Sequence, residues 1–444
     1  MIVKIKVKNF LSFKDLQEIS FIQGEDQSNM DSVINTEHIN LLTFGVIYGA
    51  NASGKSNFIK AIEFAKRKIA NKVTFKDRES YFKLDKKCKL EPSYFEFELY
   101  LDGKYYAYGF EIILNKDRII SEWLIELRQT EEIIIYSKDI KKDEWIFDTD
   151  NIGSNEFKAL LKYAFDIFKN SNGQELFLYH LKYFPIDAES VEDYDVFTKI
   201  EIFLRFSVNI GLGSAGITQY HNFLSQETLS KMSNLVQFFD TGIKKVDLIE
   251  IELDVVESHV SANSHTVFYD MVKEVETYGQ PKVIKTSAGY FVLSYVNDEV
   301  VCQTLVFKQA NDVTFKFSEL SDGTKRLIDI IDILLTHHCV YIIDEIDRYL
   351  HPLLMHKLIE IYLEVAKSNN VQLILTTHDT GLLDKNFISR DQVWFIDKND
   401  NGESKLYELE QYQNIFDNKL QTAYLEGRYR GIPNFNSYYL GDLT

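Results

Sequence analysis

Hydrophobic and polar residues alternate with a period of two over about the first 120 residues, and this pattern predicts β-strands. Residues 95–101 and 105–111 alternate on either side of an Asp-Gly pair, which predicts a β-hairpin. Further strands are expected at 122–128 and 132–137. Residues 1–8 alternate apolar side chains with lysines, so we expect a strand at an exposed sheet edge rather than a signal peptide.

The spacing of apolar residues becomes that of α-helices in the middle of the chain, from about residue 155 to 244. Strand patterns return near 245–253 and 290–296. From Phe315 onward, short apolar strands alternate with helices, which is typical of an α/β domain. The sequence therefore predicts three parts: a strand-rich N-terminal part at 1–150, a helical insertion at 151–245 and an α/β C-terminal part at 246–444.

The composition is that of a globular protein of 444 residues, with enough apolar material for a large core. The formal net charge is −18, which disfavours diffuse binding along nucleic acid. The three cysteines are far apart in the sequence, so no disulfide framework is expected. No apolar run approaches the ~20 residues that span a bilayer. These features together predict a cytoplasmic protein.

Residues 49–56 read G-A-N-A-S-G-K-S, a complete match to the phosphate-binding loop pattern G-x-x-x-x-G-K-[ST]. An apolar stretch at 42–48 precedes this loop and a helical pattern at 57–65 follows it, which is the context that the motif requires. Its glycines let backbone N–H groups converge on a triphosphate, Lys55 adds positive charge, and the Ser56 hydroxyl can bind Mg²⁺. We therefore expect ATP to bind through Gly49, Ala50, Asn51, Ala52, Ser53, Gly54, Lys55, Ser56 and Asn57.

Further polar segments in the C-terminal part follow apolar strands, whose carboxyl ends carry the ligands of α/β sheets. One strand precedes Asp344, which suits Mg²⁺, and Glu345, which is placed to polarise the attacking water. Another is followed by His378, which can hydrogen-bond a γ-phosphate or water. A second anion site is expected where a helix begins, at Ser321, Asp322, Gly323 and Thr324. The predicted catalytic residues are Glu345, His378 and Lys55, and the predicted metal ligands are Ser56 and Asp344.

These segments, in this order, resemble the heads of ABC-type P-loop ATPases, in particular the soluble SMC-like and OLD-like branch. The resemblance rests on Walker A at 49–56, a signature at 320–324 (LSDGT), Walker B at 342–345, the switch histidine His378 and an opening strand at 8–13 (KNFLSF). It is closer still to bacterial stand-alone AAA-family ATPases of PARIS-type or Abi-type anti-phage and abortive-infection systems. That closer likeness lies in SDGTKR at 321–326, DEID at 344–347, LHP at 350–352 and YLEGRY at 424–429, and the whole resemblance covers roughly 1–125 and 290–435.

The resemblance implies an α/β ATPase head with a mixed sheet, flanking helices and N-terminal antiparallel strands, interrupted by a helical insertion. It implies a homodimer or higher oligomer in which two heads enclose two ATP molecules. Ser321 and Gly323 of one copy would then contact the γ-phosphate held by the other. It also implies a Mg²⁺-dependent, ATP-hydrolysing switch that senses infection and sequesters or releases a protein effector, such as a nuclease or toxin. Asp322 departs from the pattern, because it replaces the second glycine of the signature.

An SMC-like ATPase for DNA repair or DNA binding is the main alternative. Residues 60–89 are locally basic, but the acidic chain and the lack of a sustained heptad pattern disfavour direct nucleic-acid binding. No membrane partner is expected. Residues 397–408 match a calcium-loop pattern, yet strand patterns flank them, so we interpret this segment as a hairpin turn.

Overall fold

The computed structural model divides the chain into two compact units, which are described separately. The first unit comprises Met1–Gly213, His338–Ile346 and Leu363–Thr444, and the second comprises Ser214–His337 and Asp347–Tyr362. The structure describes residues 1–26, 32–147, 155–169, 173–181, 196–211, 225–259, 265–279, 281–286, 288–384, 388–412 and 420–432. Within these ranges, no helix has both the length and the apolar composition that crossing a bilayer requires.

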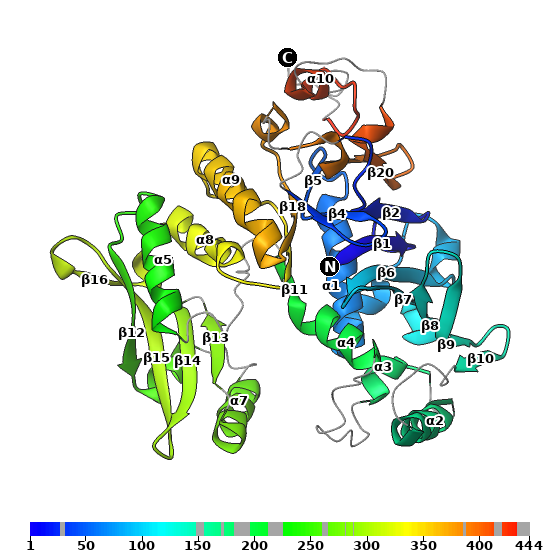
Figure 1. Ribbon diagram of the computed structural model, residues 1–444, viewed down its shortest axis with the longest axis horizontal. Helices are drawn as coiled ribbons and strands as arrows, with labels where there is room; N and C mark the ends of the chain where they lie inside the picture. Colours follow the sequence, from blue (N-terminus) through cyan, green and yellow to red (C-terminus); the bar gives the residue numbers. More distant parts are fainter. Residues whose placement is uncertain are drawn as a thin grey trace, which may run out of the picture. The chain divides into compact units, whose positions relative to one another are not determined.

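A seven-stranded antiparallel sheet forms one half of the first unit, drawn in blue to cyan in Figure 1. Its strand order is β10-β9-β8-β7-β6-β1-β2. The bounds are β1 (Ile2–Lys8), β2 (Gln17–Ser20), β6 (Ser93–Leu101), β7 (Lys104–Ile113), β8 (Arg118–Leu127), β9 (Glu132–Asp139) and β10 (Glu144–Phe147). The hairpin expected at 95–111 is confirmed, because β6 and β7 pair around Asp102 and Gly103.

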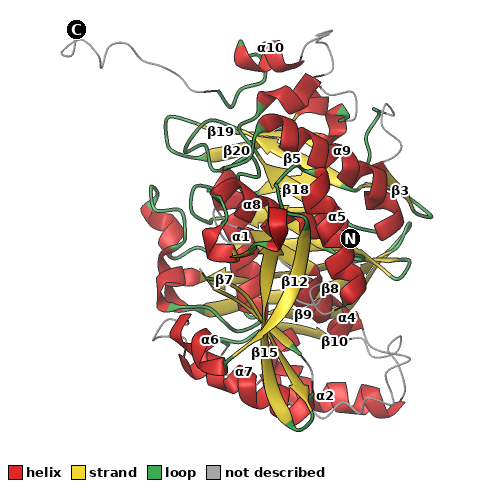
Figure 2. Cartoon of the chain, turned by 90° about the vertical axis from the view of Figure 1, so that its left-hand side faces the viewer, coloured by secondary structure: helices red, strands yellow, loops and turns green. Residues whose placement is uncertain are grey.

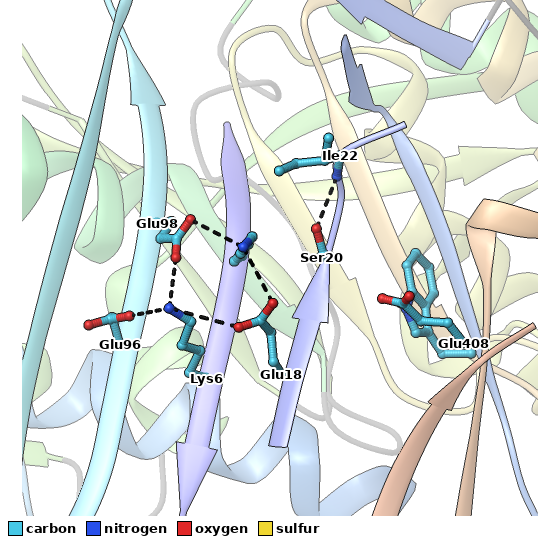
Figure 3. Close-up of polar contacts among 9 residues, drawn as sticks. Lys6, Glu18, Ser20, Ile22, Glu96, Glu98 and Glu408 are labelled. Carbon is cyan, nitrogen blue, oxygen red and sulfur yellow. Dashed lines mark hydrogen bonds and ion pairs between the residues drawn. The ribbon is translucent and has the colours of Figure 1, made fainter. Parts of the chain in front are cut away.

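The expectation that residues 1–8 form an edge strand is wrong. β1 lies between β6 and β2, and its alternating lysines mark the solvent face of the sheet rather than its rim. Figure 3 shows the reason: Lys6 Nζ lies 2.8 Å from carboxylate oxygens of both Glu96 and Glu98 on β6 and 3.8 Å from Glu18 on β2. Burial alone would lower the pKa of Lys6, but the hydrogen bonds and charges of Glu96 and Glu98 raise it. Cross-strand ion pairs therefore join three neighbouring strands.

A six-stranded sheet forms the other half of the first unit and carries the candidate site. Its order is β11-β17-β18-β5-β19-β20, with all neighbours parallel except the final hairpin. The bounds are β5 (Phe44–Tyr48), β11 (Val208–Gly211), β17 (Val340–Ile343), β18 (Gln372–Thr376), β19 (Val393–Lys398) and β20 (Ser404–Glu408). The central strands are buried throughout, as expected for a parallel sheet covered on both faces. The edge strand β11 lies within the range for which a helical insertion was expected.

Gln372 joins the two sheets of the first unit. Its fully buried side chain accepts a hydrogen bond from Ile2 N at 2.9 Å and donates to the carbonyl oxygens of Ile2 and Leu42, each at 3.0 Å. The amide thus satisfies backbone groups of the antiparallel sheet and of the strand that leads into β5. A buried amide with its hydrogen bonds made avoids the penalty of an unpaired polar group.

Helices from the middle of the chain pack on the antiparallel sheet of the first unit. They are α2 (Asn155–Lys169), α3 (Phe177–His180), α4 (Val196–Ile202) and a π-helix, η7 (Phe203–Ser207). Their aromatic side chains surround Tyr136 of β9, which stacks on Phe177 at a centroid distance of 4.9 Å. The fully buried Glu122 of β8 accepts hydrogen bonds from the Tyr136 hydroxyl and from Phe177 N. These helices therefore share the core of the first unit rather than forming one of their own.

The second unit is built on an antiparallel sheet of order β12-β15-β14-β13, with β16 paired to β15. Its strands are β12 (Lys245–Ile251), β13 (Lys282–Thr286), β14 (Gly289–Val296), β15 (Glu299–Lys308) and β16 (Thr314–Lys316). Helix α5 (Gln226–Phe238) lies against β12, and α7 (His265–Tyr278) lies against β14 and β15 (Figure 1). The helices α6 (Leu253–His259) and α8 (Asp322–Ile330) complete the unit, and its apolar core includes Phe268, Val275 and Leu293.

The remaining helices and strands are drawn with the others in Figure 2, where helices are red and strands yellow. They are α1 (Lys55–Ile69), α9 (Pro352–Asn369), α10 (Leu420–Leu425), β3 (Val33–Asn35) and β4 (Asn40–Leu42). The 3-10 helices are η2 (Phe75–Glu79), η3 (Lys86–Lys89), η4 (Leu114–Lys116), η10 (Ala310–Asp312), η11 (Phe317–Glu319), η12 (Ile331–Leu334), η13 (Thr380–Asp384), η14 (Arg390–Gln392) and η15 (Leu409–Gln411).

The buried carboxyl group of Asp391 makes the stability of the first unit depend on pH. Burial raises the pKa of Asp391 to about 6, although hydrogen bonds from the Ser389 hydroxyl and from Gly24 N lower it, and the charges of Asp26 and Glu410 add to the increase. Because the folded chain holds this proton more tightly than the unfolded chain, the contribution of Asp391 to stability is fully present below about pH 4 and is lost as pH rises through about 6. We expect Asp391→Asn to be more stable than the parent by about 2 kcal/mol at pH 8. Thermal unfolding from pH 5 to 8 should show this advantage shrinking as pH falls.

The control for this prediction is Asp400→Asn, which changes an exposed carboxylate in the β19–β20 turn. This variant should follow the parent at every pH. Equal pH dependence of the Asp391→Asn protein and the parent would contradict the prediction.

Candidate nucleotide site

The predicted phosphate-binding loop connects β5 to α1 at the carboxyl edge of the parallel sheet. Gly54, the last residue before the helix, has a φ of +123°, a conformation that side-chain-bearing residues rarely adopt. A Cβ atom on Gly54 would lie 2.4 Å from the Ser404 hydroxyl. Asn51 and Ala52 are exposed at the tip of the loop, Ala50, Ser56 and Asn57 are partly exposed, and Gly49, Ser53, Gly54 and Lys55 are buried. The fold therefore requires a glycine where the motif has one.

Small polar side chains form hydrogen bonds that hold this loop in place. The Ser404 hydroxyl on β20 donates to Ser53 O at 2.5 Å and lies 2.8 Å from the Ser12 hydroxyl. Asn57 Nδ2, in the first turn of α1, donates to Ser12 Oγ at 2.8 Å. Ser12 belongs to the opening segment KNFLSF, but Ser404 could not be recognised from the sequence, since a serine in a strand is unremarkable. These bonds fix the loop relative to the N-terminal segment and to β20.

The loop contains a positively charged side chain and hydrogen-bond donors that suit an anionic ligand. Lys55 Nζ is held by the carbonyl oxygens of Gly49 and Ala50 at 2.5 and 3.2 Å, inside the loop. The Ser53 hydroxyl is buried and, within the described part of the chain, has no hydrogen-bond partner. The first N–H groups of α1 also lack intrahelical acceptors, as at every helix start. A buried hydroxyl without a partner in the described residues, beside a lysine and a helix N-terminus, fits a phosphate group.

The two predicted acids follow β17, and a threonine on the neighbouring strand holds both. The Thr376 hydroxyl, at the end of β18, donates to Asp344 Oδ1 at 2.6 Å and accepts a hydrogen bond from Glu345 N at 2.8 Å. Asp344 is buried, whereas Glu345 is partly exposed and has a φ of +49°, so the chain turns sharply between them. Thr376 is not among the residues predicted for the site, although it directly follows the apolar run of β18.

His378 lies two residues beyond β18, on an exposed loop at the same edge of the sheet. The Tyr48 hydroxyl donates a hydrogen bond to the backbone carbonyl oxygen of Asp379, the residue after His378, at 3.1 Å. Tyr48 is the last residue of β5 and directly precedes the phosphate-binding loop. The loop that carries His378 is thus tied to the base of the loop that carries Lys55.

The first unit therefore brings together the loop at 49–57, Asp344, Glu345 and His378. They follow β5, β17 and β18, which are neighbours in the order β17-β18-β5. Since adjacent strands are about 4.8 Å apart, the strands that lead to the acids and to the phosphate-binding loop lie about 10 Å apart. Acidic groups at this separation from a phosphate-binding loop can hold a cation and a water molecule against a triphosphate.

The predicted signature belongs to the second unit. Ser321 caps α8, because its hydroxyl accepts a hydrogen bond from Thr324 N at 3.1 Å. Ser321 and Asp322 are exposed, and Gly323 and Thr324 are partly exposed. A Cβ atom on Gly323 would lie 2.9 Å from the carbonyl oxygen of Tyr349, so a glycine is needed for this close approach. The start of α8 is thus capped and accessible, as the predicted anion site requires.

Calcium binding at 397–408 has no support in this structure. β19 and β20 pair as an antiparallel hairpin with Lys398 opposite Ser404, so the segment is the expected turn. Among the residues that the structure describes, no three His, Cys, Asp or Glu side chains gather into a metal-binding group. A cation at the acidic pair would therefore need oxygen atoms from a nucleotide or water in addition to the protein.

We expect Thr376→Val to slow ATP hydrolysis about 10- to 100-fold and to weaken Mg²⁺-dependent ATP binding by a smaller factor. Valine keeps the shape of threonine but removes the hydroxyl that orients Asp344 and the backbone of Glu345. Steady-state turnover and equilibrium nucleotide binding measure the two quantities. Thr376→Ser is the matched control and should restore most of the rate. Full turnover by Thr376→Val would show that the hydroxyl does not position the acids.

Comparison with known protein families identifies a match over most of the chain. The model of a family described as "AAA domain, putative AbiEii toxin, Type IV TA system" matches residues 44–384. The matched range contains the phosphate-binding loop, the signature, the acidic pair and His378. A search of the curated proteins finds no significant match.

Proposed function

The chain belongs to this AAA domain family, and we propose that it binds and hydrolyses ATP as a molecular switch of an anti-phage defence system. The single observation that carries the proposal is the arrangement of the phosphate-binding loop, the acidic pair and His378 after three adjacent parallel strands. Such an arrangement suits a nucleoside triphosphate because ligands of open α/β sheets bind at this edge.

The residues have separate tasks in ATP binding. The N–H groups of the loop and the Lys55 ammonium bind the phosphates, and the Ser53 hydroxyl offers a further donor. Ser56 and Asp344 would hold Mg²⁺, which neutralises charge on the β- and γ-phosphates when it is bound. The hydrogen bond from Thr376 to Asp344 fixes the orientation of this carboxylate at the carboxyl edge of the sheet.

Hydrolysis then requires an activated water molecule. Glu345 polarises this water and accepts its proton, the water oxygen bonds to the γ-phosphorus, and the bond from that phosphorus to the β,γ-bridging oxygen breaks. ADP and phosphate are the products. His378 is exposed at the same edge and can donate a hydrogen bond to the γ-phosphate as negative charge redistributes.

We further propose that two copies of an ABC-type head enclose ATP between them. Ser321 and Gly323 of one copy would approach the γ-phosphate bound by the other, adding the helix start of α8 to the site. ATP then favours the closed dimer, because only the closed dimer makes the contacts between one copy and the γ-phosphate bound by the other. Hydrolysis removes these contacts and favours the open dimer. This change is the proposed means by which the chain sequesters and then releases a nuclease or toxin effector.

Co-expression with the product of an adjacent gene tests this proposal. Glu345→Gln, which should retain ATP, is expected to hold the effector in a stable complex whose mass differs from that of the nucleotide-free protein. Lys55→Ala, which should not bind ATP, is the control for nucleotide dependence. A chain that engages no such product, with or without ATP, would contradict the effector proposal. Salt-sensitive binding of duplex DNA instead would favour the SMC-like alternative.

A further inference from the structure

The C-terminal segment at 420–432 lies at the edge of the parallel sheet that carries the candidate site, and both Figure 1 and Figure 2 place α10 there. Gln421 Nε2 in α10 donates a hydrogen bond to Thr380 Oγ1 at 2.9 Å. Thr380 begins η13, two residues after His378. The segment therefore contacts one of the two loops of the candidate site through its first turn.

An aromatic stack anchors the same segment to β19. Phe395 stacks on both Tyr424 and Tyr429, with ring centroids 5.2 and 5.7 Å away and interplanar angles of 18° and 10°. Both tyrosines are buried. Tyr424 also lies 5.7 Å from the ring of Tyr48, the residue that precedes the phosphate-binding loop. Buried, stacked aromatic rings hold a segment in one place more firmly than a polar surface contact would.

The stack ends in a turn that brings backbone directly onto the phosphate-binding loop. The Tyr424 hydroxyl donates to Gly431 O at 2.8 Å, and Gly431 is buried with a φ of +70°. A Cβ atom on Gly431 would lie 3.3 Å from Gly49 Cα and 3.3 Å from Ile396 O. Gly49 also lies close to β19, because a Cβ atom added to Gly49 would lie 2.5 Å from Ile396 O. The first glycine of the loop is thus packed between β19 and the C-terminal segment.

We propose that residues 420–432 are a positioning element of the nucleotide site. Gly431 holds Gly49, and with it the start of the phosphate-binding loop, while Gln421 holds the loop that carries His378. One segment therefore fixes both the loop that binds the phosphates and the loop proposed to contact the γ-phosphate. The effect on ATP rests on the proposed function, whereas the restraint on the loop is a property of the chain itself.

The test compares Gly431→Ala with the parent by hydrogen exchange and by ATP binding. An alanine at this φ and this spacing should displace the turn from Gly49. In the protein without nucleotide, we expect amides at 48–57 to exchange about tenfold faster. ATP should bind about tenfold more weakly, with kcat at saturating ATP changed less than about twofold. Gln421→Ala should instead lower kcat with little change in ATP affinity.

Gly103→Ala is the matched control, because Gly103 has a φ of +82° but no atom lies within 4 Å of its added Cβ. Gly103→Ala introduces the same kind of backbone strain but no close contact. Its hydrogen exchange at 48–57 and its ATP binding should therefore equal those of the parent. If Gly431→Ala behaves as Gly103→Ala does, the inference is wrong. If exchange at 48–57 accelerates in Gly431→Ala while the parent itself binds no ATP, the restraint stands and the proposed function fails.

Discussion

Glu345→Gln is expected to lower ATP turnover by about a hundredfold or more while the nucleotide stays bound. Glutamine has almost the same shape as glutamate but cannot accept the proton of the attacking water. The Glu345 backbone N–H is bonded to Thr376, so the substitution leaves this support in place. Phosphate release in the steady state and the mass of the protein with ATP measure the two effects. In the presence of ATP, we expect Glu345→Gln to form a dimer that does not dissociate into monomers.

Asp344→Asn separates the two acids. Asp344 is buried and hydrogen-bonded to Thr376, and its proposed role is to hold the cation. Its substitution should weaken Mg²⁺-dependent ATP binding as well as turnover, so the dimer should not accumulate. Parental turnover by Glu345→Gln would show that another group activates the water. If Asp344→Asn and Glu345→Gln retained the nucleotide equally well, Asp344 would not be the residue that holds the cation.

The elements around the phosphate-binding loop could be predicted from the sequence because their signals are local. The apolar run before Gly49, the glycines of the loop and the helical spacing after Lys55 all lie within a short stretch, and β5, the loop and α1 follow from it. The acidic pair could be placed for the same reason, since an apolar run directly precedes Asp344.

The contacts that support these residues could not be predicted, because they depend on the pairing of strands far apart in the chain. Thr376 reaches Asp344 only through the parallel register of β17 and β18, and Ser404 reaches Ser53 across 351 positions. The placement of β1 failed for a related reason. Alternation shows which face of a strand meets solvent, but not whether another strand, here β2, lies beyond it.

Mixing two inactive variants tests whether ATP is shared between copies of the chain. Lys55→Ala should abolish ATP binding at its own loop but leaves its signature intact. Ser321→Asp should keep the cap of α8, since aspartate is also a good N-cap residue, but it places negative charge against the γ-phosphate. In a co-expressed 1:1 mixture, half of the dimers are mixed, and each mixed dimer has one of its two sites built from unaltered halves. We therefore expect about a quarter of the parental turnover, although each variant alone is inactive.

This result depends on the two halves of a site coming from different copies. If Ser321 acted on ATP bound by its own chain, every chain in the mixture would carry a damaged site and turnover would stay near zero. Purification through two different tags confirms that mixed dimers are present, so an inactive mixture would contradict the shared site. Ser321→Asn is the control, because asparagine also caps the helix but adds no charge. Its turnover should exceed that of Ser321→Asp, since the proposed repulsion is electrostatic and falls on the γ-phosphate.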